Sequence, residues 1–362
     1  MSNKAWRLTN HLAVMTFACG LSLFSSDISA SDSLHPSLQD KKSGNVIAQT
    51  SGVLVAQQLE NTGKRLENGA SSIKGTLAVF YPNVREPFRS IFTKIIEGIE
   101  ERTKGKVKSY SIDNEKTENS DLNIQLRRND TRVVIALGRI GIKAASSLDH
   151  DISVIAGGIL TVSEADQQNL SGISLNPDPT LLFARLRILL PDVKKVLMVY
   201  SPQQNESQLK LARDAAKFHG LELQAIEAKD LATAARTYET LFANADKQHS
   251  ALWLPNDPIS AEENTIIPLV LRESWNSSLP IFSSSLIHVK RGALFALYPN
   301  NLELGRNLAG SALGAMAGEP RKKGMQPLRE VHLAVNLRTA NHIGLHIEPQ
   351  QQRTFDFVYP EP

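Results

Sequence analysis

Short polar segments directly follow apolar runs in both halves of the sequence, and they carry hydroxyl, amide and glycine residues that could hold a small ligand. If the apolar runs are parallel strands, these segments lie beyond their carboxyl ends, where open parallel sheets bind ligands. Such groups hold a carboxylate or another small polar group without any chemical step. They also make ordinary turns and helix caps, so the prediction rests on their convergence at one site. The candidate ligand-binding residues are Tyr81, Asn83, Gly138, Arg139, Gly158, Ser201, Asn205, Asn256, Asp257, Ser283, Ser284 and Tyr298.

Catalytic and metal-binding patterns are missing from the sequence. It contains no GxSxG, P-loop, GxGxxG or HExxH motif. Asp257 has no accompanying nucleophile, which favours a polar ligand contact over a general base. His342 and His346 are four residues apart, but we expect surface or core histidines there rather than a metal pair. We therefore expect no enzymatic activity, no cofactor and no metal.

The charge balance argues against binding to nucleic acid. The chain has 40 Lys and Arg residues against 37 Asp and Glu residues, for a net charge of +3, whereas nucleic-acid binders usually carry a concentrated basic face. With 362 residues, 41% of them hydrophobic, it can bury a sizeable core in one large or two ordinary domains. The single cysteine, Cys19, excludes a disulfide framework and a cysteine-rich zinc site.

Residues 1–30 are typical of a secretory signal peptide. Two basic residues precede an uncharged apolar run over 12–24, which is too short to span a bilayer. Cleavage after Ala30 would leave a mature chain without cysteine, which suits an oxidising compartment. A lipoprotein modified at Cys19 and a buried N-terminal helix are the alternatives. Residues 31–72 are polar and are predicted to be a leader segment.

From residue 73 onward, apolar strand patterns alternate with helical patterns. Strands are expected at 76–83, 106–113, 132–138, 151–160, 171–175, 195–205, 221–228, 250–257 and 279–286, and helices from Phe88 and at 179–190, 207–219 and 264–274. Such alternation builds doubly wound parallel sheets, and its repetition predicts two α/β lobes. Phe88 and Phe218 are expected on the inner faces of their helices, and Trp253 and Trp275 in the core.

Two segments near the carboxyl terminus carry the most specific signal: GALFALYPNNLELGRNLAGSALGAMAGEP (292–320) and VHLAVNLRTANHIGLHI (331–347). They resemble the family of ABC transporter substrate-binding proteins that includes tryptophan and tyrosine binders. In that family a Gly-Ala strand leads to an E-L-G-R helix and a G-x-P turn, and a V-N-L-x-T-A-x-x-x-G-L segment ends the domain. The matching residues are Gly292, Ala293, Glu303, Leu304, Gly305, Arg306, Gly318, Pro320, Asn336, Leu337, Thr339, Ala340, Gly344 and Leu345.

The resemblance covers about 75–350 and implies a type I periplasmic binding-protein fold. In this fold two Rossmann-like, doubly wound lobes are joined by three crossing strands, and the ligand lies in the cleft between them. The crossings are expected near 172–175, 288–297 and 325–333. The implied organisation is a signal peptide (1–30), a polar leader (31–72), a first lobe (73–173 plus 290–322), a second lobe (174–289 plus 323–350) and a tail (351–362).

The implied function is that of a periplasmic solute-binding protein of an ABC-type importer. It would bind a small polar, amino-acid-like molecule as a monomer, with a membrane permease as partner. Relatives usually carry an Asp-Tyr-type pair before the E-L-G-R helix, whereas this chain has Tyr298-Pro299-Asn300-Asn301, so a preference for aromatic amino acids is not carried over. Arg139 stands where many relatives have a small residue; it would pair with an anionic ligand or partly fill the cleft.

Two alternatives stay open. One is a periplasmic sensor or adaptor of the same fold, with weak or lost ligand binding, that presents its lobes to a membrane receptor. The other is a secreted enzyme on a doubly wound fold, in which Asp257 would act.

Overall fold

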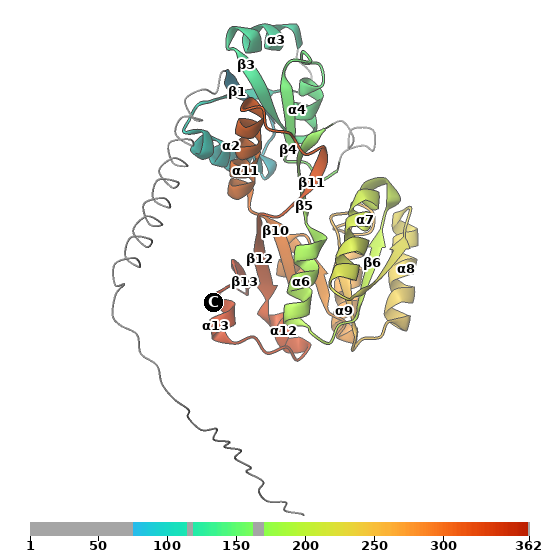
Figure 1. Cartoon of the computed structure of the whole chain (residues 1–362). Coiled ribbons are helices and arrows are strands. Elements are labelled where there is room, and N and C mark those ends of the chain that lie inside the picture. Colours follow the sequence, from blue (N-terminus) through green and yellow to red (C-terminus); the bar gives the residue numbers. More distant parts are fainter. Residues whose placement is uncertain (1–74, 114–118, 162–169, 361–362) are drawn as a thin grey trace, which may run out of the picture. The chain divides into compact units, whose positions relative to one another are not determined.

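The computed structural model describes residues 75–113, 119–161 and 170–360. The predicted signal peptide and polar leader therefore lie outside the described residues. Within them, two mainly parallel sheets are each flanked by helices (Figure 1). This is the mixed α/β architecture that the alternating patterns predict.

The first sheet has six strands in the order β11-β5-β4-β3-β1-β2, and every neighbouring pair is parallel. The strands are β1 (Thr76–Pro82), β2 (Val107–Ile112), β3 (Thr131–Leu137), β4 (Ser153–Gly157), β5 (Ser171–Pro177) and β11 (Gly324–Leu328). Its helices are α2 (Phe88–Thr103), α3 (Asn119–Arg128), α4 (Gly138–Ala145) and α11 (Asn301–Met316). Strand β3 is buried along almost its whole length, because helices pack on both faces of the sheet.

The second sheet has seven strands in the order β13-β12-β10-β9-β8-β6-β7. Only the pairing between β10 and β12 is antiparallel. The strands are β6 (Lys195–Tyr200), β7 (Glu222–Glu227), β8 (Ser250–Leu254), β9 (Ile281–Ser283), β10 (Phe295–Pro299), β12 (Val331–Asn336) and β13 (Phe357–Tyr359). The helices are α6 (Pro179–Leu189), α7 (Pro202–Phe218), α8 (Leu231–Asn244), α9 (Ile266–Ser277), α10 (Leu286–Arg291), α12 (Leu337–His342) and α13 (Pro349–Gln352).

The chain passes between the two sheets at three places, after β5, after β10 and between β11 and β12. These positions correct three predicted boundaries. Strand β10 pairs with β9 and β12 of the second sheet, whereas the resemblance implies that 290–322 belongs to the first lobe. Strand β11 pairs with β5 of the first sheet, whereas the resemblance implies that 323–350 belongs to the second lobe. Strand β5 continues in the first sheet to Pro177, past the expected boundary at residue 174.

The predicted tail is also partly wrong. Strand β13 pairs in parallel with β12, so residues within 351–362 complete the edge of the second sheet. The sequence pattern did not predict β13, because a strand of three residues is too short for an alternation of apolar and polar residues to show.

Helices α2 and α11 lie side by side on the first sheet (Figure 1), and two glycines allow their close approach. A Cβ atom at Gly98 would lie 2.0 Å from the Leu302 carbonyl oxygen, and one at Gly305 would lie 2.0 Å from the Ile95 carbonyl oxygen. Beside this contact, Arg306 pairs with Glu101 at 2.5 Å and also with Glu303. The E-L-G-R segment therefore lies at the contact between α2 and α11.

Three large side chains expected in the core are exposed. Phe88 is 61% exposed and Phe218 77%, because both stand at helix ends, beyond the sheet that their helices cover. Trp275 is 39% exposed near the end of α9, whereas Trp253 on β8 is fully buried, as predicted.

Candidate functional site

The candidate residues of the first lobe lie at the carboxyl ends of three adjacent strands. Tyr81 and Asn83 stand at the end of β1, and Gly138, Arg139 and Gly158 directly follow β3 and β4. Because these strands pair in parallel, their ends share one edge of the sheet, as the sequence predicted.

Gly138 and Gly158 meet at the ring of Phe92 on α2. Both have positive φ, +67° and +64°, and a Cβ atom on either would lie 3.1 Å from that ring. Glycine is therefore required at both positions for conformation as well as for space. These two glycines therefore shape the edge of the sheet where α2 packs against it.

Arg139 and Asn83 present polar groups at the same edge. Arg139 stands in the first turn of α4; its side chain is exposed and has no ion pair with a described residue. The Asn83 amide nitrogen donates to the Asp113 carboxylate at 2.9 Å, and its backbone N–H donates to Ile112 at 3.0 Å. Arg139 is thus a cation at this edge that is available to an anionic group.

In the second lobe, Asp257 lies at the centre of a buried hydrogen-bond network. Its carboxylate accepts from the Ser201 backbone N–H at 2.7 Å, the Ser201 hydroxyl at 3.1 Å and the Asn205 amide at 2.8 Å. It also accepts from the backbone N–H groups of Ile259 and Ser260, at 2.8 and 3.0 Å. Both oxygens are therefore engaged within the chain, and Asp257 joins the start of α7 to the loop after β8.

This network changes the interpretation of three candidates. Ser201, Asn205 and Asp257 do converge, but all three side chains are buried and point to one another. Among the described residues, the side-chain oxygen of Asn205 has no hydrogen-bond partner, and neither has the hydroxyl of Ser260 beside it. Asn256 differs, because it is only partly buried and its amide donates to Asn176 at 3.1 Å.

Ser283 and Ser284 follow β9 and are likewise engaged. The Ser283 hydroxyl lies 2.6 Å from Nδ1 of His288, and the Ser284 hydroxyl accepts from the Trp253 indole at 3.3 Å. Nε2 of His288 contacts Glu263 at 3.1 Å. Burial lowers the pKa of His288, although the Glu263 carboxylate acts in the opposite direction.

Within the described part of the chain, Tyr298 shares none of the hydrogen bonds of Ser283, Ser284 and His288. Its ring lies 5.4 Å from that of His332 on the neighbouring strand β12, and it packs near Leu286 of α10. Burial and then the Asp356 carboxylate raise its pKa.

The crossing strand β5 supplies polar residues that sequence reasoning missed. The Asn176 amide nitrogen donates to the Leu160 carbonyl at 3.0 Å, while its oxygen accepts from Asn256. Nearby, the Gln208 amide donates to the Pro177 carbonyl at 3.2 Å, and Thr161 contacts Gln204 at 3.3 Å. These hydrogen bonds connect segments at the ends of β4 and β5 of the first sheet to α7 and the loop after β8 beside the second sheet. The available signal was the sequence SLNPD (174–178), which overlaps the end of the expected strand at 171–175.

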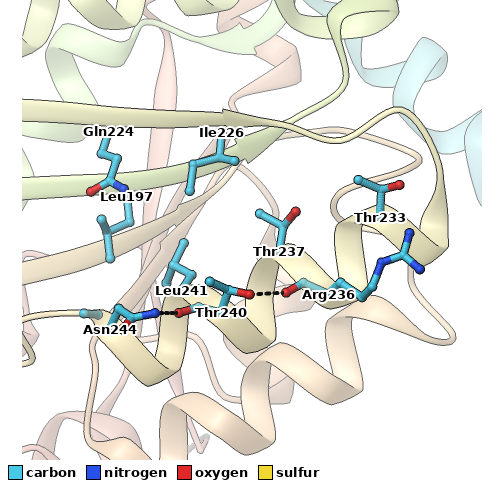
Figure 2. Close-up of a pocket in the computed structure, with 10 residues that line it drawn as sticks. Leu197, Gln224, Ile226, Thr233, Arg236, Thr237, Thr240, Leu241 and Asn244 are labelled. Carbon is cyan, nitrogen blue, oxygen red and sulfur yellow. Dashed lines mark hydrogen bonds between the residues drawn. The ribbon is translucent and has the colours of Figure 1, made fainter.

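Two cavities lie away from the candidate residues. One, of about 410 Å³, lies between α8 and strands β6 and β7, with Leu197, Ile226 and Leu241 toward its interior (Figure 2). Its Thr240 and Asn244 side chains bond to carbonyls of their own helix. The other, of about 510 Å³, lies between α11 and the crossing segments, where Arg329 pairs with Asp178 at 2.6 Å. Neither cavity includes a predicted site residue.

The described residues contain neither a membrane-spanning helix nor a cluster of metal ligands. Across residues 75–113, 119–161 and 170–360, no helix is long and apolar enough to cross a membrane. In the same residues no group of three or more His, Cys, Asp or Glu side chains could hold a metal ion. His346 pairs with Glu348 instead of joining His342.

Comparison with known proteins agrees with this architecture. A crystal structure of an ABC domain in complex with L-Trp from Streptococcus pneumonia is 19% identical, with a TM-score of 0.51, over 79% of this chain and 100% of that one. The ligand-free, open structure of a substrate binding protein with adhesive properties from Clostridium difficile is 16% identical, with a TM-score of 0.56 over the same shares. At these identities the likeness shows the fold, which is that of type I periplasmic binding proteins.

A sequence-family comparison identifies the chain more directly. No curated protein matches the sequence. The model of the family described as "ABC transporter substrate binding protein" matches residues 89–351, which is well over half of the chain. This range includes both sheets' crossing segments and both carboxyl-terminal motifs. The chain therefore belongs to the ABC transporter substrate binding protein family.

Proposed function

We propose that this protein binds a small polar, amino-acid-like molecule between its two lobes and delivers it to the membrane permease of an ABC-type importer. In this proposal it acts in the bacterial periplasm, as a monomer, without catalysis. Closing the two lobes on the ligand would desolvate it and select it by hydrogen bonds, because the closed state is favoured only by contacts that the ligand adds there.

The observation that carries the proposal is the placement of polar groups at the carboxyl ends of both sheets, beside the chain crossings. Arg139 supports binding of an anionic group, since its guanidinium is exposed and has no carboxylate partner among the described residues. Asn256 supports recognition from the second lobe, and its bond to Asn176 couples that recognition to a crossing strand.

The sensor or adaptor alternative also has a specific observation in its favour. Asp257 and Ser201 are hydrogen-bonded to each other, and the Ser283 hydroxyl bonds to the Leu254 carbonyl and to His288. A site so depleted of free polar groups would bind a ligand weakly, while the two lobes could still be presented to a membrane receptor.

Mass spectrometry of molecules released from the purified protein would test the proposal, followed by thermal unfolding with each identified solute and with a metabolite panel. We expect a released solute that raises the melting temperature and makes the protein more compact in small-angle scattering. Absence of a released molecule, of stabilisation and of compaction would contradict solute binding and favour the sensor alternative.

A further inference from the structure

A third pocket, of about 290 Å³, lies at the opposite end of the second sheet from the candidate residues. Gly292, just before β10, and Asn336, at the end of the antiparallel strand β12, both line it. Since β10 runs parallel to β9, this is the amino-terminal edge of those parallel strands. The pocket is therefore separate from the strand ends where Ser283 and Asn256 lie.

The charged side chains that line this pocket are all cationic. Arg272, Lys290, Arg291 and Arg338 line it, together with His342, and no Asp or Glu does. Carboxylates outside the lining neutralise two of them: Arg272 contacts Glu273 at 3.1 Å, and Arg291 contacts Glu263 at 2.6 Å.

Lys290 and Arg338 lack such neutralisation. Neither forms an ion pair with a described residue, and each lies instead over an aromatic ring. The Lys290 ammonium is 5.1 Å from the centre of the Phe357 ring, and the Arg338 guanidinium is 5.4 Å from that of Trp275. Cation–π contacts orient a cation without neutralising its charge, so both remain able to bind an anion.

The walls of the pocket are fixed by bonds within the chain. The Asn336 amide donates to the Val289 carbonyl at 2.8 Å, and the Thr339 hydroxyl donates to the Gly292 carbonyl at 3.0 Å. His342 stacks on the Trp275 ring at 3.6 Å between centres, and its Nε2 donates to the Trp275 carbonyl at 2.8 Å. Its Nδ1 forms no hydrogen bond with a described residue. The exposed Trp275 ring is therefore held as part of a preformed surface.

We propose that the pocket between Lys290 and Arg338 binds the phosphate group of a small organic phosphate or of a lipid headgroup. An arginine fork and a lysine point charge are the side chains that proteins use for phosphate. The volume lies near the lower end of small-molecule pockets, about 300 Å³, which suits a small ester. This site is independent of the solute site proposed above, so either can fail without the other.

Titration of the full chain with glycerol 3-phosphate tests the proposal, with isothermal calorimetry and tryptophan fluorescence as readouts. We expect saturable binding and a change in Trp275 emission that Trp275→Phe abolishes. The double substitution Lys290→Gln with Arg338→Gln should weaken binding at least tenfold. Its matched control is Lys210→Gln with Arg213→Gln, two exposed cations on α7 of the same lobe, which should bind as the unmodified chain does.

Co-sedimentation with vesicles separates the two sources of phosphate. Binding to phosphatidylglycerol vesicles but not to phosphatidylcholine vesicles, lost in the same double variant, would assign a headgroup; binding to glycerol 3-phosphate alone would assign a soluble ester. If the double variant does not fold, Arg338→Lys and each single glutamine variant serve in its place. Absence of binding in both assays, or equal binding by the pocket and control variants, would overturn the proposal.

Discussion

The Ser283 hydroxyl lies 2.6 Å from Nδ1 of His288, and both side chains are buried. Nε2 faces the Glu263 carboxylate, which can only accept, so the hydrogen bonds assign the ring proton to Nε2 and leave Nδ1 to accept from Ser283. Arg291 also pairs with Glu263. The arrangement resembles a catalytic relay, but the serine is fully buried and faces no cavity described above.

The lowered pKa of His288 predicts a loss of stability in acid. In the unfolded chain the imidazole takes up a proton near pH 6.5, whereas burial delays this in the folded chain. Its contribution is therefore complete above about pH 6.5 and is lost as the pH falls from there toward the lower folded-state pKa. Urea unfolding at pH 7.5 and 5.0 should show a larger loss for the unmodified chain than for His288→Gln. Equal losses in the two proteins would contradict this assignment.

Close packing of α2 on α11 predicts that added methyl groups are costly at two glycines. Gly305→Ala would place Cβ 2.0 Å from the Ile95 carbonyl oxygen, and we expect a loss of about 3 kcal/mol, the upper part of the usual range for overpacking. Gly98→Ala should behave in the same way.

Gly310→Ala, on the same helix, is the matched control for this pair. Nothing lies within 4 Å of its added Cβ, so we expect a gain of about 0.5–1 kcal/mol from helix propensity. Denaturant unfolding measures all three variants. A Gly305→Ala protein as stable as Gly310→Ala would show that the helices can separate freely.

Asp257 is expected to stabilise the fold rather than to act on a substrate. Asp257→Ala would leave the buried donors of Ser201, Asn205 and Ser260 without their acceptor, and we expect a loss of about 3 kcal/mol. Asp230→Ala, which removes a surface cap of α8 bonded to Thr233, should cost clearly less. The two unfolding free energies can be compared directly, and similar losses would count against the network.

Arg139 should contribute to affinity without contributing to stability. Under the proposed function, Arg139→Ala should weaken binding of the solute by at least tenfold, because its exposed guanidinium supplies a charge-assisted bond. Lys143→Ala on the same helix, also exposed, is the control and should leave affinity unchanged. Calorimetry gives the affinities, and thermal unfolding should give equal melting temperatures. Unchanged affinity in Arg139→Ala would remove this residue from the site.

Sequence patterns predicted the strands well because burial on both faces leaves a clear mark. Residues 133–137 of β3 are an uninterrupted apolar run, and so are residues 251–254 of β8. The patterns could not assign β10 and β11 to their sheets, since that depends on which edge each strand pairs with rather than on its own composition. They also misplaced Trp275, because a helix end extends beyond the layer that would cover it.

For the candidate site, the positions were more predictable than the roles. The strand ends followed from the apolar runs, and Ser201, Asn205 and Asp257 do meet. That they form hydrogen bonds with one another could not be predicted from the sequence. Residue type determines which donors and acceptors a side chain has, but the folded geometry determines which of them are paired. Asn176 was missed because the predicted strand ended at residue 175, whereas β5 continues to Pro177.

The interleaved order of the strands has a consequence for how the protein is made. The core beneath the first sheet joins Leu77 and Val79 to Leu304, Leu308 and Leu328. During synthesis Leu77 and Val79 can pack on early residues such as Ile95, but this cluster stays incomplete until Leu304, Leu308 and Leu328 have been made. Helix α11 and strand β11 are synthesised late, and they complete the core of the sheet whose first strand is synthesised early.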